Sequence, residues 1–261
     1  MSQERISFQP PVNPDENREA QAVSVETILQ VLAEGQLDVL GTLPWGSNYT
    51  FLATVTGDEY ELKAVYKPCG GERPLWDFPD GSLCLREMAT YLLSQPLGWP
   101  LIPPTVLREG PYGLGTVQFF IKADPNIHYF TLRDNPRYLT YFQQIAVFDY
   151  IVNNADRKGG HCLRDDRGRI WSIDHGLTFH IEPKLRTVIW EFCEQPIPEN
   201  ILADLRMLRQ ALQDGVPPLD TLAQLISYRE KQVLEQRIGY LLSTRVFPSP
   251  TLGRNVPFPP V

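Results

Sequence analysis

Long apolar runs are missing from this sequence. Among its 261 residues, no stretch approaches the roughly 20 apolar residues that a transmembrane helix needs. The first residues, MSQERISFQPPVNPDENREAQ, are polar and contain no apolar signal-peptide core. We therefore expect a cytoplasmic protein with no stable membrane insertion, a flexible segment over residues 1–22 and an irregular, Pro-rich tail over residues 247–261.

Cysteine is scarce as well. The four cysteines, Cys69, Cys84, Cys162 and Cys193, form no Cys-x-x-Cys pair. Their scatter indicates neither a zinc knuckle nor a disulfide framework. A reducing compartment is the simplest setting for such a chain.

The sequence also lacks an excess of positive charge. Its 24 Lys and Arg residues stand against 31 Asp and Glu residues, which gives a formal net charge of −7. This balance argues against a general binder of nucleic acid or of anionic membranes, while it still allows a local site for phosphates. The hydrophobic content of 43% can supply a core, and the length fits one large domain or two lobes that share a cleft.

The first half of the chain has mostly strand-like patterns. Residues 24–33 predict a short helix with Ser24 as its N-cap and Gly35 just beyond its end. Three alternating runs follow, QLDVLGTL, NYTFLATVT and EYELKAVYK, and their turn signals predict an antiparallel meander. A Gly- and Pro-rich loop over residues 68–82 leads to the helix LCLREMATYLLSQPLG, the turn-rich stretch WPLIPPTVLREGPYGLG and a further strand, TVQFFIKA.

The second half is mainly helical. The segment YLTYFQQIAVFDYIVNN predicts a buried helix that ends at the Asn-Asn pair, and IWSID predicts a short strand. Two amphipathic helices follow, ENILADLRMLRQALQ and LISYREKQVLEQRIGYLLS. The fold class is therefore predicted to be α+β, with a β-rich N-lobe over residues 23–124 and a mainly helical C-lobe over residues 125–246.

Several charged residues are placed where nucleotide chemistry could use them. Asp156 precedes His161 by five residues, the offset of Asp and Asn in the catalytic loop of protein kinases, and Asp174 ends a short strand. Lys67 ends the run AVYK, and Glu87 on the next helix could hold its ammonium group in place. Phosphoryl transfer needs a cation over the phosphates, ligands for a divalent metal and a carboxylate that orients the attacking hydroxyl. The sequence thus predicts an ATP cleft between two lobes.

The order of these motifs resembles that of a known superfamily. The segments NNADRKGGHCL and IWSIDHGLTF are similar to the catalytic and metal-binding loops of the phosphatidylinositol 3/4-kinase-like superfamily, closest to the type II and plant gamma phosphatidylinositol 4-kinases. WGSNYTF and VYKP resemble its phosphate loop and lysine segment, and REMATYLL, PPT and TVQFFI resemble further segments. GERPLWDFPDG and LRTVIW also resemble a bacterial group of kinase-like proteins typified by actinobacterial members.

The resemblance implies a two-lobed protein-kinase-like fold and a role for each matching position. Lys67 would contact the α-phosphate, Glu87 would pair with Lys67, and Asp156 would be the catalytic aspartate. Asp174 and His161 would bind the metal. The implied nucleotide contacts are Gly46, Ser47, Asn48, Lys67, Phe120 and Ile121. The implied cofactors are ATP and a divalent metal, Mg²⁺ or Mn²⁺, and the acceptor is an alcohol group on a protein, a small molecule or an inositol lipid.

Two positions depart from the superfamily pattern. Lys158 stands where many members have His, and His161 stands where they have the metal-binding Asn. Imidazole favours softer ions than Mg²⁺, which makes Mn²⁺ a candidate. The leading hypothesis is an ATP-dependent phosphotransferase, and the alternative is a nucleotide-binding pseudokinase, with a regulatory or scaffolding role, in which His161 marks lost catalysis.

Other readings of the same residues remain open. Taken singly, Asp156 could be a turn aspartate paired with a neighbouring arginine, and Lys67 could be a solvated lysine at a strand end. A metal-dependent hydrolase built on His161 and His175 is a third functional hypothesis, although the spacing of the histidines matches no usual zinc pattern.

Overall fold

The computed structural model describes residues 5–7, 22–43 and 48–261. Contacts divide the chain into two compact units: unit 1 comprises Met1–Cys84 and Pro103–Phe120, and unit 2 comprises Leu85–Ile102 and Ile121–Val261. Most of the segment predicted to be flexible, residues 1–22, lies outside the described residues. Within it, strand β1 (Arg5–Ser7) pairs antiparallel with β2 (Ala22–Ser24). The lobe boundaries inferred from the sequence stay a prediction.

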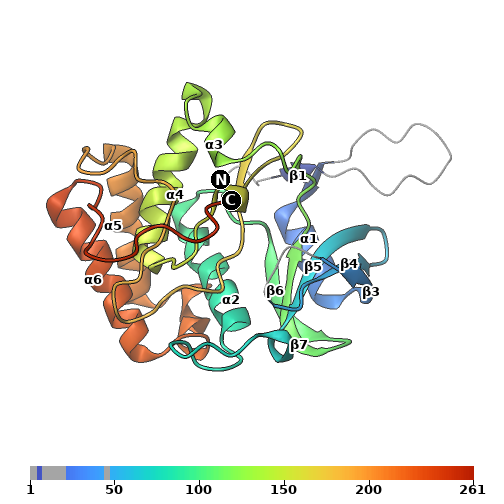
Figure 1. The fold of residues 1–261 in the computed structure, drawn as a ribbon. Helices are drawn as coiled ribbons and strands as arrows, with labels where there is room; N and C mark the ends of the chain where they lie inside the picture. The colour runs from blue at the N-terminus through green and yellow to red at the C-terminus, as the bar shows by residue number, and fades with distance from the viewer. Residues whose placement is uncertain (1–4, 8–21, 44–47) are drawn as a thin grey trace. The chain divides into compact units, whose positions relative to one another are not determined.

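Unit 1 is built on a five-stranded antiparallel sheet with the order β3-β4-β5-β7-β6 (Figure 1). Its strands are β3 (Gln36–Thr42), β4 (Phe51–Thr56), β5 (Glu61–Pro68), β6 (Thr105–Gly110) and β7 (Gly113–Phe119). The predicted meander of β3, β4 and β5 is confirmed. The interpretation of residues 105–110 as part of a turn-rich stretch is wrong, because these residues form the edge strand β6. The prolines before this strand and the glycines after it are typical of turns, which explains the error.

Helix α1 (Val25–Glu34) packs against this sheet and confirms the first predicted helix. Ser24 caps it, since its Oγ accepts a hydrogen bond from the backbone N–H of Thr27 at 3.1 Å. Ile28 and Leu32 are fully buried. A Cβ atom on Gly35 would lie 2.7 Å from the carbonyl oxygen of Val31, so the helix end requires glycine for space.

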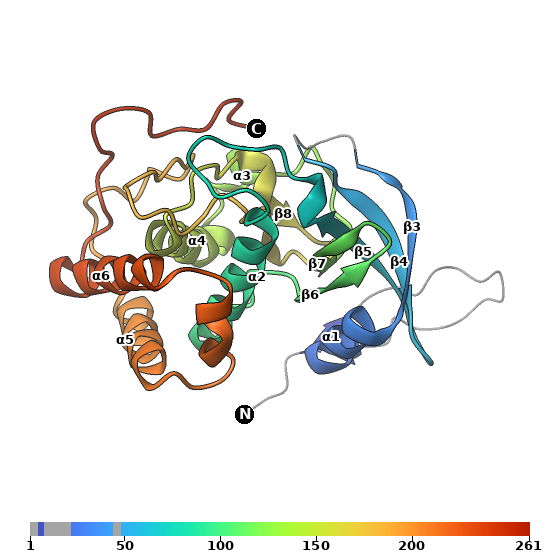
Figure 2. The same cartoon turned by 90° about the horizontal axis from the view of Figure 1, so that it is seen from below.

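Unit 2 contains most of the helical residues and one short β-hairpin. Its helices are α2 (Leu83–Ser94), which begins in unit 1, α3 (Tyr129–Leu132), α4 (Leu139–Val152), α5 (Glu199–Asp214) and α6 (Tyr228–Thr244), and its strands are β8 (Cys162–Arg164) and β9 (Ile170–Ser172). Short 3₁₀ helices span Gln95–Leu97, Pro136–Tyr138, Gly159–His161 and Leu219–Gln224, and another, Cys69–Gly71, lies in unit 1. Figure 2 shows α6 packed beside α5 and α4.

Helices α2, α4, α5 and α6 form where the sequence predicts helices, whereas the short helix α3 was not predicted. The buried residues of α5 are Ile201, Leu202, Leu205, Leu208 and Leu212, a spacing of three to four residues that forms one apolar stripe. In α4, buried residues lie on more than one side, so this helix is a core element. Within the described residues, no helix has both the length and the apolar character needed to cross a membrane.

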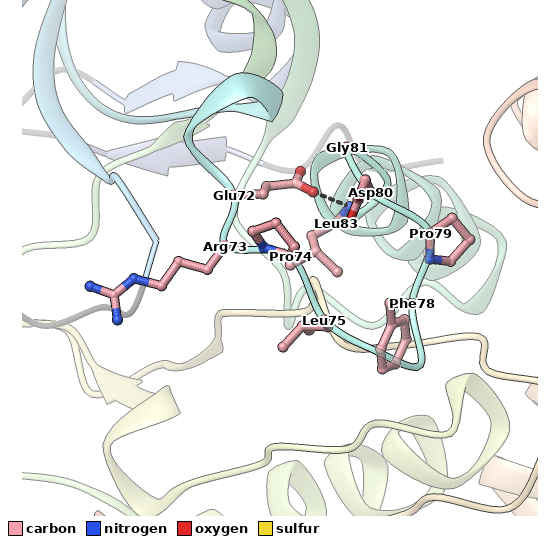
Figure 3. Close-up of a pocket in the computed structure, with 9 residues that line it drawn as sticks. All are labelled: Glu72, Arg73, Pro74, Leu75, Phe78, Pro79, Asp80, Gly81 and Leu83. Atoms are coloured by element: carbon pink, nitrogen blue, oxygen red, sulfur yellow. Dashed lines mark hydrogen bonds between the residues drawn. The ribbon is translucent and has the colours of Figure 1, made fainter.

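A disulfide bond joins Cys69 to Cys84 across the loop over residues 68–82. The sequence did not indicate it, because the two cysteines are 15 positions apart and it is the fold of the loop between β5 and α2 that brings their Cα atoms to 5.5 Å. Glu72 accepts a hydrogen bond from the backbone N–H of Leu83 at 3.0 Å (Figure 3) and another from the backbone N–H of Cys84 at 2.7 Å. The Glu72 carboxylate therefore caps the start of α2.

The Pro-rich tail over residues 247–261 has no regular helix or strand, yet it packs on unit 2. Phe247 is 2% exposed. The carbonyl of Asn255 accepts hydrogen bonds from Thr187 N and from Trp190 Nε1, each at 3.0 Å. Further along, the carbonyl of Pro260 accepts one from Gly159 N at 2.8 Å. The tail thus reaches the loop that contains Asp156 and His161.

Candidate functional site

Three of the predicted site residues lie together in unit 2. Asp156, His161 and Asp174 each place one possible metal-ligand atom within 4.8 Å of the other two. His161 Nε2 lies 3.4 Å from Asp174 Oδ2, and the Asp174 side chain is 49% exposed. The cluster is therefore open to solvent on the Asp174 side.

The end of α4 positions Asp156. Asn153 adopts a left-handed conformation, with φ at 54°, and its N–H closes the helix on the carbonyls of Asp149 and Tyr150. Asn154 Oδ1 then accepts a hydrogen bond from Asp156 N at 3.0 Å. The Asn-Asn pair therefore both ends the helix, as predicted, and builds the turn that presents Asp156.

The β8–β9 hairpin brings His161 and Asp174 together. His161 immediately precedes β8, Asp174 follows β9, and Cys162 pairs in register with Ser172. One further hydrogen bond, from Ile173 N to His161 O at 3.0 Å, extends the pairing up to the two site residues. Asp174 has a φ of 62°, a left-handed conformation that is uncommon for residues other than glycine and that is often found at functional sites.

The environment of Asp156 raises the pKa of its carboxyl above the usual aspartate value. Burial raises the pKa of the Asp156 carboxyl, and the nearby charge of Asp174 raises it further. The ammonium of Lys158, at 3.1 Å from Asp156 Oδ2, lowers the pKa without cancelling the effect of burial. A carboxylate with a raised pKa is a better acceptor for the proton of a hydroxyl group.

The other predicted residues are divided between the two units. Lys67 lies on β5, half-buried and opposite Thr116 of β7 in the register. Asn48 is also in unit 1, where its Oδ1 accepts a hydrogen bond from Arg73 N at 2.9 Å. Glu87 lies on α2 in unit 2 and is 3% exposed. The pairing of Lys67 with Glu87 stays a prediction.

Phe120 and Ile121 lie where the chain passes from unit 1 to unit 2. Phe120 N donates a hydrogen bond to Lys63 O of β5 at 3.0 Å, and Ile121 is 8% exposed. Their predicted contact with adenine stays a prediction. Gly46 and Ser47, the expected phosphate-loop residues, lie outside the described residues.

His175 is a buried partner of Arg157, whereas the hydrolase hypothesis makes it a metal ligand. It is fully buried, and its Nε2 lies 2.7 Å from the Nη2 of Arg157. Because a guanidinium can only donate, His175 Nε2 accepts this hydrogen bond. That nitrogen is therefore already engaged, which counts against a metal held jointly by His161 and His175.

The buried partners of the site were not predicted from the sequence motifs. Arg157, directly after Asp156, is fully buried and forms an ion pair with Asp149 of α4, with Nε 2.9 Å from Oδ2. A signal for this pair was present, since Asp149 is a carboxylate inside the otherwise apolar stretch AVFDYIV. A buried charge requires a partner.

The loop over residues 72–83 forms a small pocket of unit 1 (Figure 3). Its lining residues are Glu72, Arg73, Pro74, Leu75, Phe78, Pro79, Asp80, Gly81 and Leu83. The cavity volume is about 30 Å³, far below the roughly 300–1,000 Å³ of ligand pockets. This pocket is therefore too small for a nucleotide.

Comparison with known proteins gives matches of different extent. No family model matches the chain. It is 40% identical over 262 residues to Protein Rv2133c of Mycobacterium tuberculosis, a match that covers 88% of this chain and 94% of that protein. It is 30% identical over 115 residues to Phosphatidylinositol 4-kinase gamma 4 of Oryza sativa subsp. japonica, which covers 37% of this chain and 20% of that protein.

Among solved structures, the proinflammatory kinase CtkA of Helicobacter pylori is similar with a TM-score of 0.50 and 11% identity, over 83% of this chain and 94% of that one. At this identity the likeness shows the fold alone. The predicted fold class is confirmed: the chain has an α+β, two-lobed, kinase-like fold with an antiparallel β-rich N-lobe and a mainly helical C-lobe. Through its match along nearly the whole mycobacterial protein, the chain belongs to the family of Protein Rv2133c.

Proposed function

We propose that this chain is an ATP-dependent phosphotransferase of the phosphatidylinositol 3/4-kinase-like type, which transfers the γ-phosphate of ATP to an alcohol group. The observation that supports this most is the meeting of Asp156, His161 and Asp174 within 4.8 Å in a chain with a kinase-like fold. The partial match to a plant phosphatidylinositol 4-kinase gives further support. The acceptor is a protein, a small molecule or an inositol lipid.

In this proposal Asp156 orients the acceptor. Its carboxylate accepts a hydrogen bond from the acceptor hydroxyl and takes up the proton as the phosphate is transferred. Burial raises the pKa of Asp156 and so strengthens it as a base. Lys158, 3.1 Å away, holds the carboxylate in place.

Asp174 and His161 would hold the divalent metal, with the Asp156 carboxylate nearby. Ligand atoms on opposite sides of an ion with bonds of about 2.1 Å are about 4.2 Å apart, so a group of donor atoms within 4.8 Å needs only a small adjustment. The carboxylate of Asp174 suits both Mg²⁺ and Mn²⁺, whereas the imidazole of His161 favours Mn²⁺. When bound, the ion neutralises charge on the phosphate oxygens.

The proposed nucleotide contacts come from both units. Lys67 of β5 would contact the α-phosphate, with Glu87 of α2 as its partner. Asn48, with Gly46 and Ser47, would form the phosphate loop, and Phe120 and Ile121 would contact adenine. The backbone of Phe120 supports this assignment, because its N–H donates to Lys63 O on β5, the strand that contains Lys67.

One observation favours a second candidate, a nucleotide-binding pseudokinase with a regulatory or scaffolding role. His161 occupies the position of the metal-binding Asn of similar kinases, and its Nε2 is already 3.4 Å from Asp174 Oδ2. Such a protein would bind ATP without turnover. Both candidates bind a nucleotide, and only the phosphotransferase transfers its phosphate.

Thermal unfolding tests the shared part. ATP with Mn²⁺ or Mg²⁺, at about 100 times its dissociation constant, should stabilise the native state by about 2.7 kcal/mol, which raises Tm by roughly 5–10 °C for a chain of this size. Wild type should shift only when nucleotide and metal are both present, and Asp174→Ala should not shift. Asp220→Ala, at an exposed position outside the cluster, is the matched control and should shift like wild type.

Turnover separates the candidates. Asp156→Asn should keep the thermal shift and lose about 10²–10⁴-fold of the ATP turnover. If wild type shows the shift but no turnover with any acceptor, the pseudokinase is supported. If nucleotide and metal do not change the Tm of wild type, both candidates are wrong.

A further inference from the structure

We propose that Arg157 is the positioning residue of the metal site, and that its buried ion pair with Asp149 fixes the placement of Asp174 relative to His161. This inference rests on the proposed function, because it assigns the device that holds the metal ligands of that same site. It adds a role that the sequence motifs do not reveal.

Arg157 is anchored on α4 through its ion pair with Asp149. Both side chains of the pair are completely buried. Arg157 Nε lies 2.9 Å from Asp149 Oδ2, and Arg157 Nη2 lies 3.0 Å from Asp149 Oδ1. Asn154 Nδ2 also donates to Asp149 Oδ1, at 2.9 Å. This two-pronged contact fixes the plane of the guanidinium against a core helix.

The rest of the guanidinium contacts the residues on either side of Asp174. Arg157 Nη1 donates to the carbonyl of Ile173 at 2.8 Å and approaches the carbonyl of His161 at 3.5 Å. Arg157 Nη2 lies 2.7 Å from His175 Nε2. One rigid group therefore bonds to both neighbours of Asp174 in the chain and also contacts the backbone of His161.

These contacts account for the conformation of the site. Asp174 has a left-handed backbone, with φ at 62°, which persists only where the surroundings hold it. Arg157 holds the residue on each side of it. Because the same side chain is fixed to Asp149, the positions of the metal ligands depend on α4 as well as on their own loops.

A purely stabilising role explains the pair less well. Burial lowers the pKa of Arg157, but the charge of Asp149 and its hydrogen bonds outweigh this effect and raise the pKa, so the guanidinium stays charged. Buried ion pairs can often be replaced by uncharged residues of similar volume without loss of stability. Stability alone therefore does not explain the choice of charged residues, whereas a fork of donors at fixed positions requires arginine.

Mn²⁺ affinity, measured by electron paramagnetic resonance on the full chain without nucleotide, tests the proposal. In Arg157→Lys the charge remains but the fork is lost, and in the double variant Asp149→Asn with Arg157→Met both charges are removed while Asn keeps an acceptor for Asn154. Each should raise the dissociation constant of Mn²⁺ by about 10–100-fold, the usual effect of removing an outer partner of metal ligands. The double variant should also retain a cooperative melt, with a Tm lowered by the acceptors on Ile173 and His175 that lose their donor.

Glu230→Gln is the matched control. Glu230 forms a second buried ion pair, with Arg86 Nη2 at 2.5 Å, and caps α6 through Ser227. Its loss should lower the Tm while the Mn²⁺ affinity stays within about twofold of wild type. A fall in stability alone would then be distinguishable from a misplaced metal site.

The outcomes separate this inference from the proposed function. If wild type binds Mn²⁺ and both variants bind it equally well, Arg157 has no positioning role and the proposed function stands. If wild type does not bind Mn²⁺, the metal site itself is wrong and the positioning role is wrong with it. Weakened Mn²⁺ binding in a folded Arg157→Lys protein, with Glu230→Gln unaffected, supports the inference.

Discussion

Breaking the Cys69–Cys84 disulfide should destabilise the protein by an amount that follows from the length of the loop it closes. The two cysteines are 15 positions apart. In the chain-entropy model, closing a loop of that length removes enough freedom from the unfolded chain to contribute about 3 kcal/mol at 25 °C. The double variant Cys69→Ser with Cys84→Ser should therefore melt roughly 6–12 °C below the oxidised wild type.

The assay is thermal unfolding with and without dithiothreitol. Reductant should lower the Tm of wild type to near that of the double variant and leave the double variant unchanged. Cys193→Ser is the matched control, because Cys193 is a free cysteine, and its response to reductant should equal that of wild type. Equal Tm values for oxidised wild type, reduced wild type and the double variant would refute the reasoning.

The disulfide also bears on the setting of the protein. Disulfides persist in oxidising compartments and are rare in the reducing cytoplasm. The cytoplasmic location inferred from the sequence stays a prediction, and the fraction of Cys69–Cys84 that is oxidised in freshly isolated protein, measured by thiol alkylation and mass spectrometry, tests it.

Three further predictions follow from local contacts. Burial raises the pKa of the Glu230 carboxyl, but its hydrogen bonds outweigh this effect and hold the pKa below the usual value. The stabilising contribution of Glu230 is therefore present above the unfolded pKa of about 4.3 and is lost as the pH falls through the folded pKa. The urea midpoint of Glu230→Gln should fall less between pH 7 and pH 3 than that of wild type. Gly159→Ala would place a Cβ atom 2.8 Å from the ring of Phe130 and should destabilise by about 1–3 kcal/mol, whereas Gly160→Ala, whose nearest neighbour would be 4.0 Å away, should change the Tm little; equal Tm values for the two variants would contradict this. Removing residues 255–261 deletes the acceptors for three hydrogen bonds at or near the loop and should lower both the Tm and ATP turnover, and a truncated protein with unchanged turnover would show that the tail does not support the loop.

Elements whose determinants are local could be predicted from the sequence. The apolar period, the N-cap Ser24 and the terminal Gly35 all lie within or beside one short segment, so α1 was predicted with its correct end. Strand β6 was missed because its pairing partner is β7 and its own six residues are flanked by Pro and Gly. Strand pairing depends on both partner segments, so the sequence of one segment alone does not predict it.

The candidate site also contains residues whose proximity could be predicted from the sequence and a contact that could not. The spacing of Asp156, His161 and Asp174 matches a motif, so the sequence identified the cluster that the fold brings together. Motif spacing could not reveal the ion pair between Arg157 and Asp149, since this contact depends on how the loop returns to the end of α4. The lone carboxylate within an apolar helix was the available signal.

The hydrogen bond from Gly159 to the carbonyl of Pro260 sets an order of events during protein synthesis. The ribosome adds roughly 5–20 residues per second, so about 5–20 s separate the synthesis of these two residues. During that interval the loop around Asp156 lacks one of its backbone partners, even if the helices before it have already folded. A nascent chain would therefore complete the backbone contacts of this loop only after Pro260 has been synthesised.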